Sequence, residues 1–194
     1  MASRWTQAAT ILPPTLKVCG RRLLPFCLRH RVALEAIESP VILPGLSLTP
    51  DHILAASKIL SSHDLGELRK PATWRDNYHY TRLMFNKAAL VEETAKIRYY
   101  FDAQSLWPRF WNKDSAAAES GTPWPLAVIA SLIRNGSSYE QAWTMPESEA
   151  IWLHIAHSQA NGSEINIVTE KEWEAMEAHR EQMEATNNPR NSQN

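Results

Sequence analysis

The sequence has few of the residues from which common catalytic sites are built. Only six of its 194 residues are glycine, and no two of them lie within three positions of each other. This excludes a phosphate-binding loop and a dinucleotide-binding fingerprint. The serines follow no G-x-S-x-G pattern, so the sequence shows no hydrolase nucleophile. We therefore expect a protein that is not an enzyme and that holds no cofactor.

Cysteine is scarce as well. The two cysteines, Cys19 and Cys27, are eight positions apart, and neither lies near a pair of histidines in the sequence. Because this is not a zinc-ligand spacing, no metal site is expected. The pair fits reduced thiols in the cytoplasm, although the spacing does not exclude a disulfide.

The chain also lacks a long apolar run. No segment reaches the roughly 18 apolar residues that a membrane-spanning helix needs. The first 28 residues carry arginine but no acidic residue, as a transit peptide does. Pro13, Pro14 and Pro25 nevertheless interrupt any long amphipathic helix there. We expect a cytoplasmic protein without a membrane partner.

A strong net charge is absent too. The formal net charge is −1, which argues against a nucleic-acid partner. The charge is nevertheless unevenly spread, because residues 4–35 carry six bases and one acid, whereas residues 164–184 carry seven acids and two bases. Ends of opposite sign suit head-to-tail contact in a homo-oligomer or an ordered protein partner. Two solvated helix faces explain the pattern equally well.

What the sequence does contain is a succession of helix signals. Apolar residues recur at helical spacing, and residues that cap helices precede them, as at Thr49-Pro50-Asp51 and at the capping box Thr169-Glu-Lys-Glu172. We expect an all-α protein, an irregular bundle of about six to seven helices, with a short N-terminal hairpin around Gly20. The helix over 123–134 is apolar nearly all round, which is typical of a fully buried helix. Thr144 is expected to cap the helix that follows it.

The chain is expected to form two helical segments. Residues 1–111 make the N-terminal segment, with one long helix over 73–104, where glycine and proline are absent. The alanine-rich run 112–121 is typical of a linker. Residues 122–185 make the C-terminal helical segment, and the polar tail 186–194 is expected to be disordered.

Aromatic residues gather in the middle of the chain. Fourteen of the seventeen lie between Trp74 and Trp152. They form either the core of a small helical domain or a binding surface, because aromatic side chains carry large buried areas and are enriched at binding hot spots. The residues expected to contact a protein partner are Trp107, Phe110, Trp111, Trp124, Trp143, Met145 and Trp152.

Among the seven histidines, His154 and His157 are three positions apart and can share one helix face. They lack the H-E-x-x-H pattern and a third ligand at a familiar spacing, so a structural pair is favoured over a metal site. An uncharacterised helical enzyme using this pair stays an alternative. The other histidines, His30 and His63 among them, stand isolated.

The helix over 146–160 carries glutamates instead of Lys or Arg, which argues against DNA recognition.

Two segments carry short motifs that begin helices. The first runs from Leu23-Leu-Pro-Phe26 to Ser39-Pro40 and on to Leu48-Thr-Pro-Asp51, and the second is Trp143-Thr-Met-Pro-Glu147. Together they resemble the tail assembly chaperone-like proteins encoded in tail gene clusters of tailed phages and prophages. The chain departs from that pattern at Leu24, where the family often has Arg, and at Cys27, where the family often has Ser.

The resemblance implies a non-enzymatic role in virion assembly. Such proteins are thought to coat the long tape-measure helix while tail-tube subunits polymerise around it, so the implied partner is a tape-measure or tail-tube protein in the cytoplasm of a bacterial host. Long amphipathic helices aggregate when alone, and a helical protein with an aromatic groove can cover them. The alternative is a minor structural component of the particle, such as a connector or baseplate adaptor.

Overall fold

The computed structural model describes residues 4–10, 15–43, 47–64, 66, 69–109, 122–165 and 167–187. Within these ranges the chain forms nine α-helices and one two-stranded hairpin, which confirms the predicted all-α class. The elements are α1 Arg4–Thr10, β1 Lys17–Val18, β2 Arg21–Arg22, α2 Leu28–Ala36, α3 Pro50–Leu60, α4 Trp74–Phe85, α5 Lys87–Gln104, α6 Trp124–Arg134, α7 Tyr139–Thr144, α8 Glu147–Ala160 and α9 Glu170–Asn187. The number of helices exceeds the predicted six to seven because α1 was not expected and because the long helix predicted over 73–104 is divided into α4 and α5.

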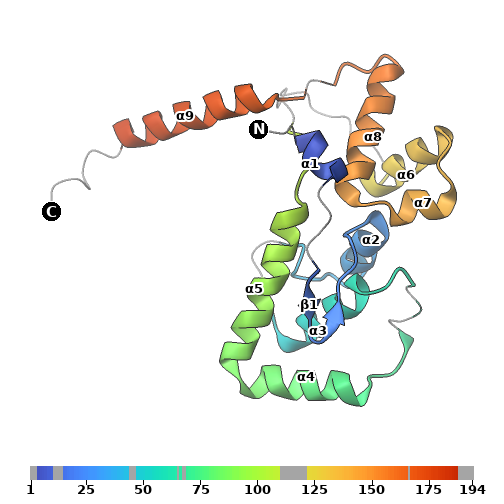
Figure 1. Cartoon of the computed structure of the whole chain (residues 1–194), viewed down its shortest axis with the longest axis vertical. Coiled ribbons are helices and arrows are strands. Elements are labelled where there is room, and N and C mark those ends of the chain that lie inside the picture. Colours follow the sequence, from blue (N-terminus) through green and yellow to red (C-terminus); the bar gives the residue numbers. More distant parts are fainter. Residues whose placement is uncertain are drawn as a thin grey trace.

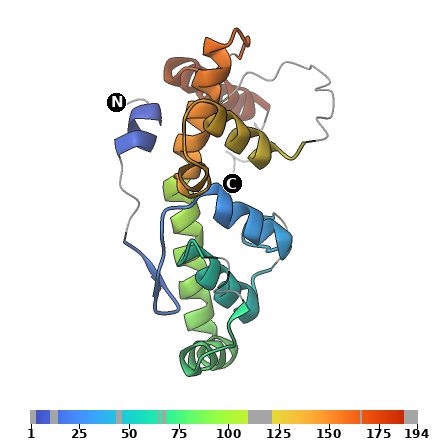
Figure 2. The same cartoon turned by 90° about the vertical axis from the view of Figure 1, so that its right-hand side faces the viewer.

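Two groups of helices meet at α2 (Figures 1 and 2). The hairpin, α3, α4 and α5 surround one buried cluster, to which α2 contributes Ala33 and Leu34. A second cluster lies between α6, α7 and α8, and α2 contributes Leu28 to it. The predicted linker 112–121 lies outside the described residues. Because α2 supplies side chains to both clusters, the N-terminal and C-terminal segments share one helix at their contact.

The predicted hairpin around Gly20 is confirmed. β1 and β2 pair antiparallel across a two-residue turn at Cys19 and Gly20, both of which have positive φ (48° and 72°). Two positive φ angles are the mark of a type I′ turn, which matches the twist of paired strands. The backbone N–H of Cys19 donates a hydrogen bond of 2.9 Å to Glu93 of α5, and this bond ties the turn to the helix.

The single helix predicted over 73–104 is wrong. Asn86 leaves the helical region (φ −123°, ψ 96°), ends α4 and begins α5. Its backbone N–H donates to the carbonyl of Arg82 at 2.9 Å, and its side-chain oxygen accepts the N–H of Ala89 at 3.0 Å. Asparagine is a strong N-cap residue, so one side chain divides a run that has neither glycine nor proline. Figure 1 shows that the two helices then run in clearly different directions.

The expectation that the helix over 123–134 is fully buried is also wrong. α6 packs Val128, Ile129 and Leu132 into the second cluster, but Leu126 and Ile133 are exposed. The helix is therefore apolar on its outer face as well as its inner one.

The two groups of helices are joined at the start of α8. The backbone N–H of Glu147 donates to the carbonyl of Phe26 at 2.8 Å, and Pro146 forms a β-bridge with Cys27. Both carboxylate oxygens of Glu147 accept hydrogen bonds from the guanidinium of Arg31. The prediction that Thr144 caps the helix after it is therefore wrong. Thr144 is the last residue of α7, and α8 begins after Pro146 without a side-chain cap.

α9 lies apart from the other helices (Figure 1). It begins with the capping box that the sequence indicates: Thr169 donates from its backbone N–H to Glu172 at 2.7 Å, and the N–H of Glu172 donates back to the Thr169 hydroxyl at 3.4 Å. It runs to Asn187, so the predicted disordered tail cannot begin at 186; residues 188–194 lie outside the described ranges. No helix of the described part is both long and apolar enough to cross a membrane.

The ion pair between Arg31 and Glu147 gives a prediction for stability. The side chain of Glu147 is 2% exposed, so Glu147→Ala leaves the largely buried Arg31 guanidinium without its main partner. Removing one member of a buried pair costs about 3–5 kcal/mol, and we expect the free energy of unfolding, measured by urea denaturation, to fall by that amount. The control is Glu92→Ala, which breaks ion pairs with Arg82 and Lys96 in which every partner is at least 30% exposed and should change stability little. Equal losses in the two variants would contradict the role of the buried pair.

Candidate functional site

The structure divides the aromatic residues expected to bind a partner. Trp107 and Trp124 come together, with ring centroids 6.0 Å apart. Trp152 lies elsewhere, where its indole N–H donates to the carbonyl of Leu106 at 2.9 Å and its ring meets Trp5 edge to face. Trp143 and Met145 are half-buried against the second cluster. Phe110 and Trp111 lie outside the described residues.

Trp107 and Trp124 have an internal partner. The guanidinium of Arg31 lies 5.0 Å from the centre of the Trp107 ring, 5.2 Å from that of Trp124 and 5.3 Å from that of Phe26. A cation at these distances is attracted by the ring faces. The two tryptophans are still partly exposed, but they help to hold the cation that joins α2 to α8. Their surface role stays a prediction.

A more exposed aromatic surface lies on α4. Trp74, Tyr78 and Phe85 are 74%, 61% and 87% exposed. At 3.6 residues per turn these three positions fall within about 40° of one another around the helix. We call this set the α4 aromatic face. Exposed apolar side chains that gather on one face, unlike singly scattered ones, mark an interaction site.

The opposite side of α4 holds the helix to the body. Leu83 and Asp76 are buried there, nearly half a turn around the helix from the aromatic face. Asp76 accepts a hydrogen bond of 2.8 Å from Arg21 of β2 and another of 2.9 Å from the backbone N–H of Thr73. Lys58 of α3 lies 3.6 Å from the same carboxylate. These contacts fix which face of α4 is turned outward.

Burial raises the pKa of Asp76, but the hydrogen bonds from Arg21 and Thr73 lower it more, and the resulting pKa lies well below the ordinary value. Sequence reasoning did not single out this face, because it treated residues 73–104 as one long helix and named none of the face's three aromatic residues among the partner-binding residues. The spacing of Trp74, Tyr78 and Phe85 at i, i+4 and i+11 was the signal that could have found it.

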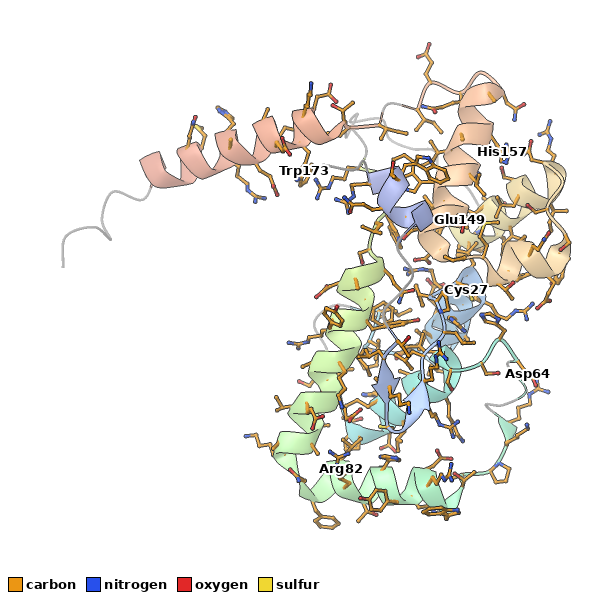
Figure 3. All side chains as sticks on the ribbon, in the orientation of Figure 1. Cys27, Asp64, Arg82, Glu149, His157 and Trp173 are labelled. Carbon is orange, nitrogen blue, oxygen red and sulfur yellow. The ribbon has the colours of Figure 1, made fainter. Side chains whose placement is uncertain are left out.

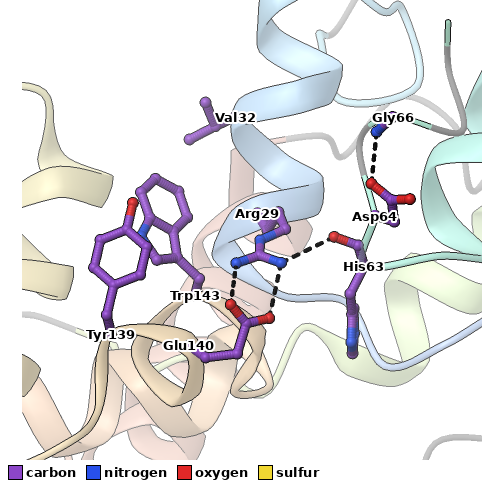
Figure 4. Close-up of a pocket in the computed structure, with 8 residues that line it drawn as sticks. All are labelled: Arg29, Val32, His63, Asp64, Gly66, Tyr139, Glu140 and Trp143. Carbon is purple, nitrogen blue, oxygen red and sulfur yellow. Dashed lines mark hydrogen bonds and ion pairs between the residues drawn. The ribbon is translucent and has the colours of Figure 1, made fainter.

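A pocket of about 680 Å³ opens between the start of α2, α7 and the loop after α3 (Figure 4). Arg29 crosses it: its guanidinium donates two hydrogen bonds, of 2.9 and 2.8 Å, to the carboxylate of Glu140 and one of 3.0 Å to the carbonyl of His63. Trp143 and Tyr139 line one wall. This volume lies in the range of small-ligand pockets, although the bidentate ion pair occupies its polar groups.

Behind this pocket a thiol and two imidazoles gather. One potential ligand atom from each of Cys27, His30 and His63 lies within 4.8 Å of the other two. Cys27 and His30 are fully buried and His63 is half-buried. Figure 3 shows Cys27 at the start of α2, between the two groups of helices. We call these three residues the Cys-His-His cluster.

The polar atoms of this cluster are only partly satisfied. Nε2 of His30 lies 3.1 Å from the carbonyl oxygen of Ser62. Nδ1 of His30 and Nε2 of His63 are buried and make no hydrogen bond of normal geometry in the described part of the chain, although the Pro25 backbone also acts on the His30 ring. Burial lowers the pKa of His30 to about 4, so this imidazole is neutral at pH 7. Burial also raises the pKa of Cys27, and the backbone N–H groups of His30 and Arg29 oppose that rise.

Sequence reasoning missed this cluster. It predicted no metal site, and it described Cys27 as remote from paired histidines and His30 and His63 as isolated. The spacing Cys27-x-x-His30 was a signal that could have identified two members. His63 comes from the loop after α3, 33 positions beyond His30, and only the packing of α3 against α2 brings it there. Cys19 and Cys27 are both free and buried in this structure.

The histidine pair on α8, His154 and His157, has fewer features of a ligand-binding site than the Cys-His-His cluster. His154 is half-buried, its Nδ1 has no hydrogen-bond partner among the described residues, and burial followed by the nearby His157 lowers its pKa. In the part of the chain that the structure describes, no third residue joins the pair to form a group of ligands. An enzyme built on His154 and His157 gains no supporting geometry from these residues.

The anchoring of α4 predicts an acid-dependent loss of stability. Because the folded-state pKa of Asp76 lies below its ordinary value of 3.8, the ionised carboxylate stabilises the fold above that pH, and this contribution is lost as the pH falls below it. Asp76→Asn should lower the free energy of unfolding at pH 7 and flatten its decline below pH 4, as measured by urea denaturation across pH. Asp51→Asn, at an exposed position of α3, should keep the wild-type slope. An unchanged slope in Asp76→Asn would argue against this anchor.

Comparison of the chain with family models, with characterised proteins and with solved structures found no match. Two arrangements among the described residues point to binding: the α4 aromatic face on the surface, and the Cys-His-His cluster, whose His63 also lines the pocket.

Proposed function

We propose that this protein is a non-enzymatic binding protein whose α4 aromatic face docks on a helix of another protein. We further propose that this partner is the tape-measure protein of a phage or prophage tail module, bound during tail assembly. The observation that carries the binding role is the exposure of Trp74, Tyr78 and Phe85 on one side of a helix whose other side is fixed to the body.

The form of the face favours a helical partner. From Trp74 to Phe85 the face extends over three helical turns, about 16 Å. Such a stripe suits a second helix that presents apolar residues at i, i+3, i+4 and i+7 along its own face. A long amphipathic helix offers this pattern many times over, so several copies of the protein could line up along it.

Charge next to the face supports the same kind of partner. The guanidinium of Arg75 lies 5.4 Å from the centre of the Trp74 ring, which holds a cation beside the apolar stripe. Aromatic anchors flanked by arginine are typical of binding hot spots. A helix with apolar residues on one side and acidic residues along the margin of that side would contact both the aromatic stripe and the arginine.

The tail-assembly part of the proposal depends on the motifs around Phe26 and Pro146. In this chain the two motifs meet in space, because Pro146 pairs with Cys27 and Glu147 with Phe26 and Arg31. Residues that resemble one family at two distant places in the sequence thus belong to one junction. This contact offers a reason for the two motifs to occur together, since each would need the other to form the junction.

The test is co-expression with the tape-measure protein of the same tail gene cluster. We expect the two proteins to co-purify, and we expect the double variant Trp74→Glu/Phe85→Glu to weaken the complex by at least tenfold, because hot-spot aromatics commonly contribute a factor of that size or more. The readout is the dissociation constant measured by calorimetry or interferometry. Both positions are highly exposed, so the variant should fold normally.

The matched control is Tyr99→Glu, at an exposed aromatic position on α5. It should bind as the wild type does. Wild-type affinity in the α4 double variant would reject the α4 face, and failure of the wild-type protein to bind the tape-measure protein would reject the tail-assembly role. Mass spectrometry of purified particles then separates an assembly factor, which leaves, from a connector or adaptor, which remains.

A further inference from the structure

We propose that Cys27, His30 and His63 bind a zinc ion through one sulfur and two imidazole nitrogens, with the fourth position left to solvent or an added ligand. This site is independent of the α4 aromatic face and of the partner proposed for it. It would connect the start of α2 to the loop that follows α3.

The positions of the ligand atoms suit such an ion. They lie within 4.8 Å of one another. In a tetrahedral zinc site the Zn–N and Zn–S bonds place neighbouring ligand atoms about 3.3–3.6 Å apart. The ligand atoms therefore need to move together by at most about 1.5 Å, which side-chain rotation can supply.

The hydrogen bonds of the cluster point to the same conclusion. His30 turns Nε2 toward the carbonyl of Ser62 at 3.1 Å, which leaves Nδ1 buried without a partner. A metal-bound histidine almost always donates its second ring N–H to a carbonyl or carboxylate in this way. Nε2 of His63 is likewise buried and unpartnered. Leaving such atoms unsatisfied is costly, and a zinc ion between them would satisfy both.

The donor set selects the class of metal. A thiolate with two neutral imidazoles suits zinc and other soft or borderline ions, whereas magnesium and calcium prefer oxygen ligands. Cys27 immediately precedes α2 and His30 lies in the first turn of that helix, so both ligands stand at the same helix end. Burial raises the pKa of the Cys27 thiol, so the ion must displace its proton.

The charges around the cluster are compatible with a cation. The positive charge of Arg29 acts on His63, but its guanidinium is bound by the carboxylate of Glu140. Glu147, whose charge acts on Cys27, is likewise bound by the guanidinium of Arg31, so the two ion pairs leave little net charge beside the cluster. Because the Cys27 thiol must lose its proton when it binds the metal, zinc affinity should fall as the pH is lowered.

The experiment uses the full chain, purified with a chelator and then titrated with Zn²⁺ against a chromophoric competitor. We expect one equivalent to bind, with a raised melting temperature. Titration with Co²⁺ should give a thiolate-to-cobalt charge-transfer band, which reports a sulfur ligand directly. His63→Ala, in the half-buried loop, should weaken Zn²⁺ binding by at least tenfold, and Cys27→Ser should abolish the band.

Two matched controls separate ligation from general damage. Cys19→Ser removes the other buried cysteine, and His154→Ala removes another histidine with an unpartnered buried nitrogen. Both should bind Zn²⁺ and Co²⁺ as the wild type does, and circular dichroism checks that each variant folds. The proposal is overturned if the wild-type chain binds no equivalent of Zn²⁺, if His63→Ala binds as tightly as the wild type, or if the cobalt band persists in Cys27→Ser. Equal loss in the controls would overturn it as well.

Discussion

The arrangement of this protein depends on one buried ion pair, Arg31 with Glu147. The pair lies where α2 meets the start of α8, and both carboxylate oxygens bind the guanidinium. Phe26, Trp107 and Trp124 surround the same guanidinium. Taking two charges out of water is costly unless their geometry and hydrogen bonds are nearly complete. The C-terminal helices therefore have little freedom in how they sit against α2.

That junction also creates the surroundings of the Cys-His-His cluster. Cys27 lies between Phe26, which accepts the Glu147 backbone N–H, and α2, which carries His30. Cys27 forms a β-bridge with Pro146 and is fully buried. The junction that joins the two helix groups thus includes one of the three proposed zinc ligands. The α4 aromatic face arises separately, because Asp76 binds Arg21 and Thr73 on the inner side, and the outer side is exposed in the part of the chain that the structure describes.

Sequence reasoning succeeded where the determining interactions are local. The hairpin at Gly20, the helix after Thr49 and the capping box at Thr169 depend on hydrogen bonds or φ angles within a few residues. It failed at Asn86 because this residue resembles any polar position on a helix surface until its side chain is seen to cap α5. It failed at Thr144 because α8 begins from a contact with Phe26, more than a hundred positions away.

The sequence by itself determined that the chain is helical, where most helices begin, and that aromatic residues are concentrated in its middle. Only the tertiary structure decided which aromatics surround Arg31 and which, such as Phe85, remain in solvent. It likewise brought His63 beside Cys27 and His30. The physical reason is that helix starts follow from neighbouring residues, whereas burial and ligand geometry follow from packing between segments far apart in the chain.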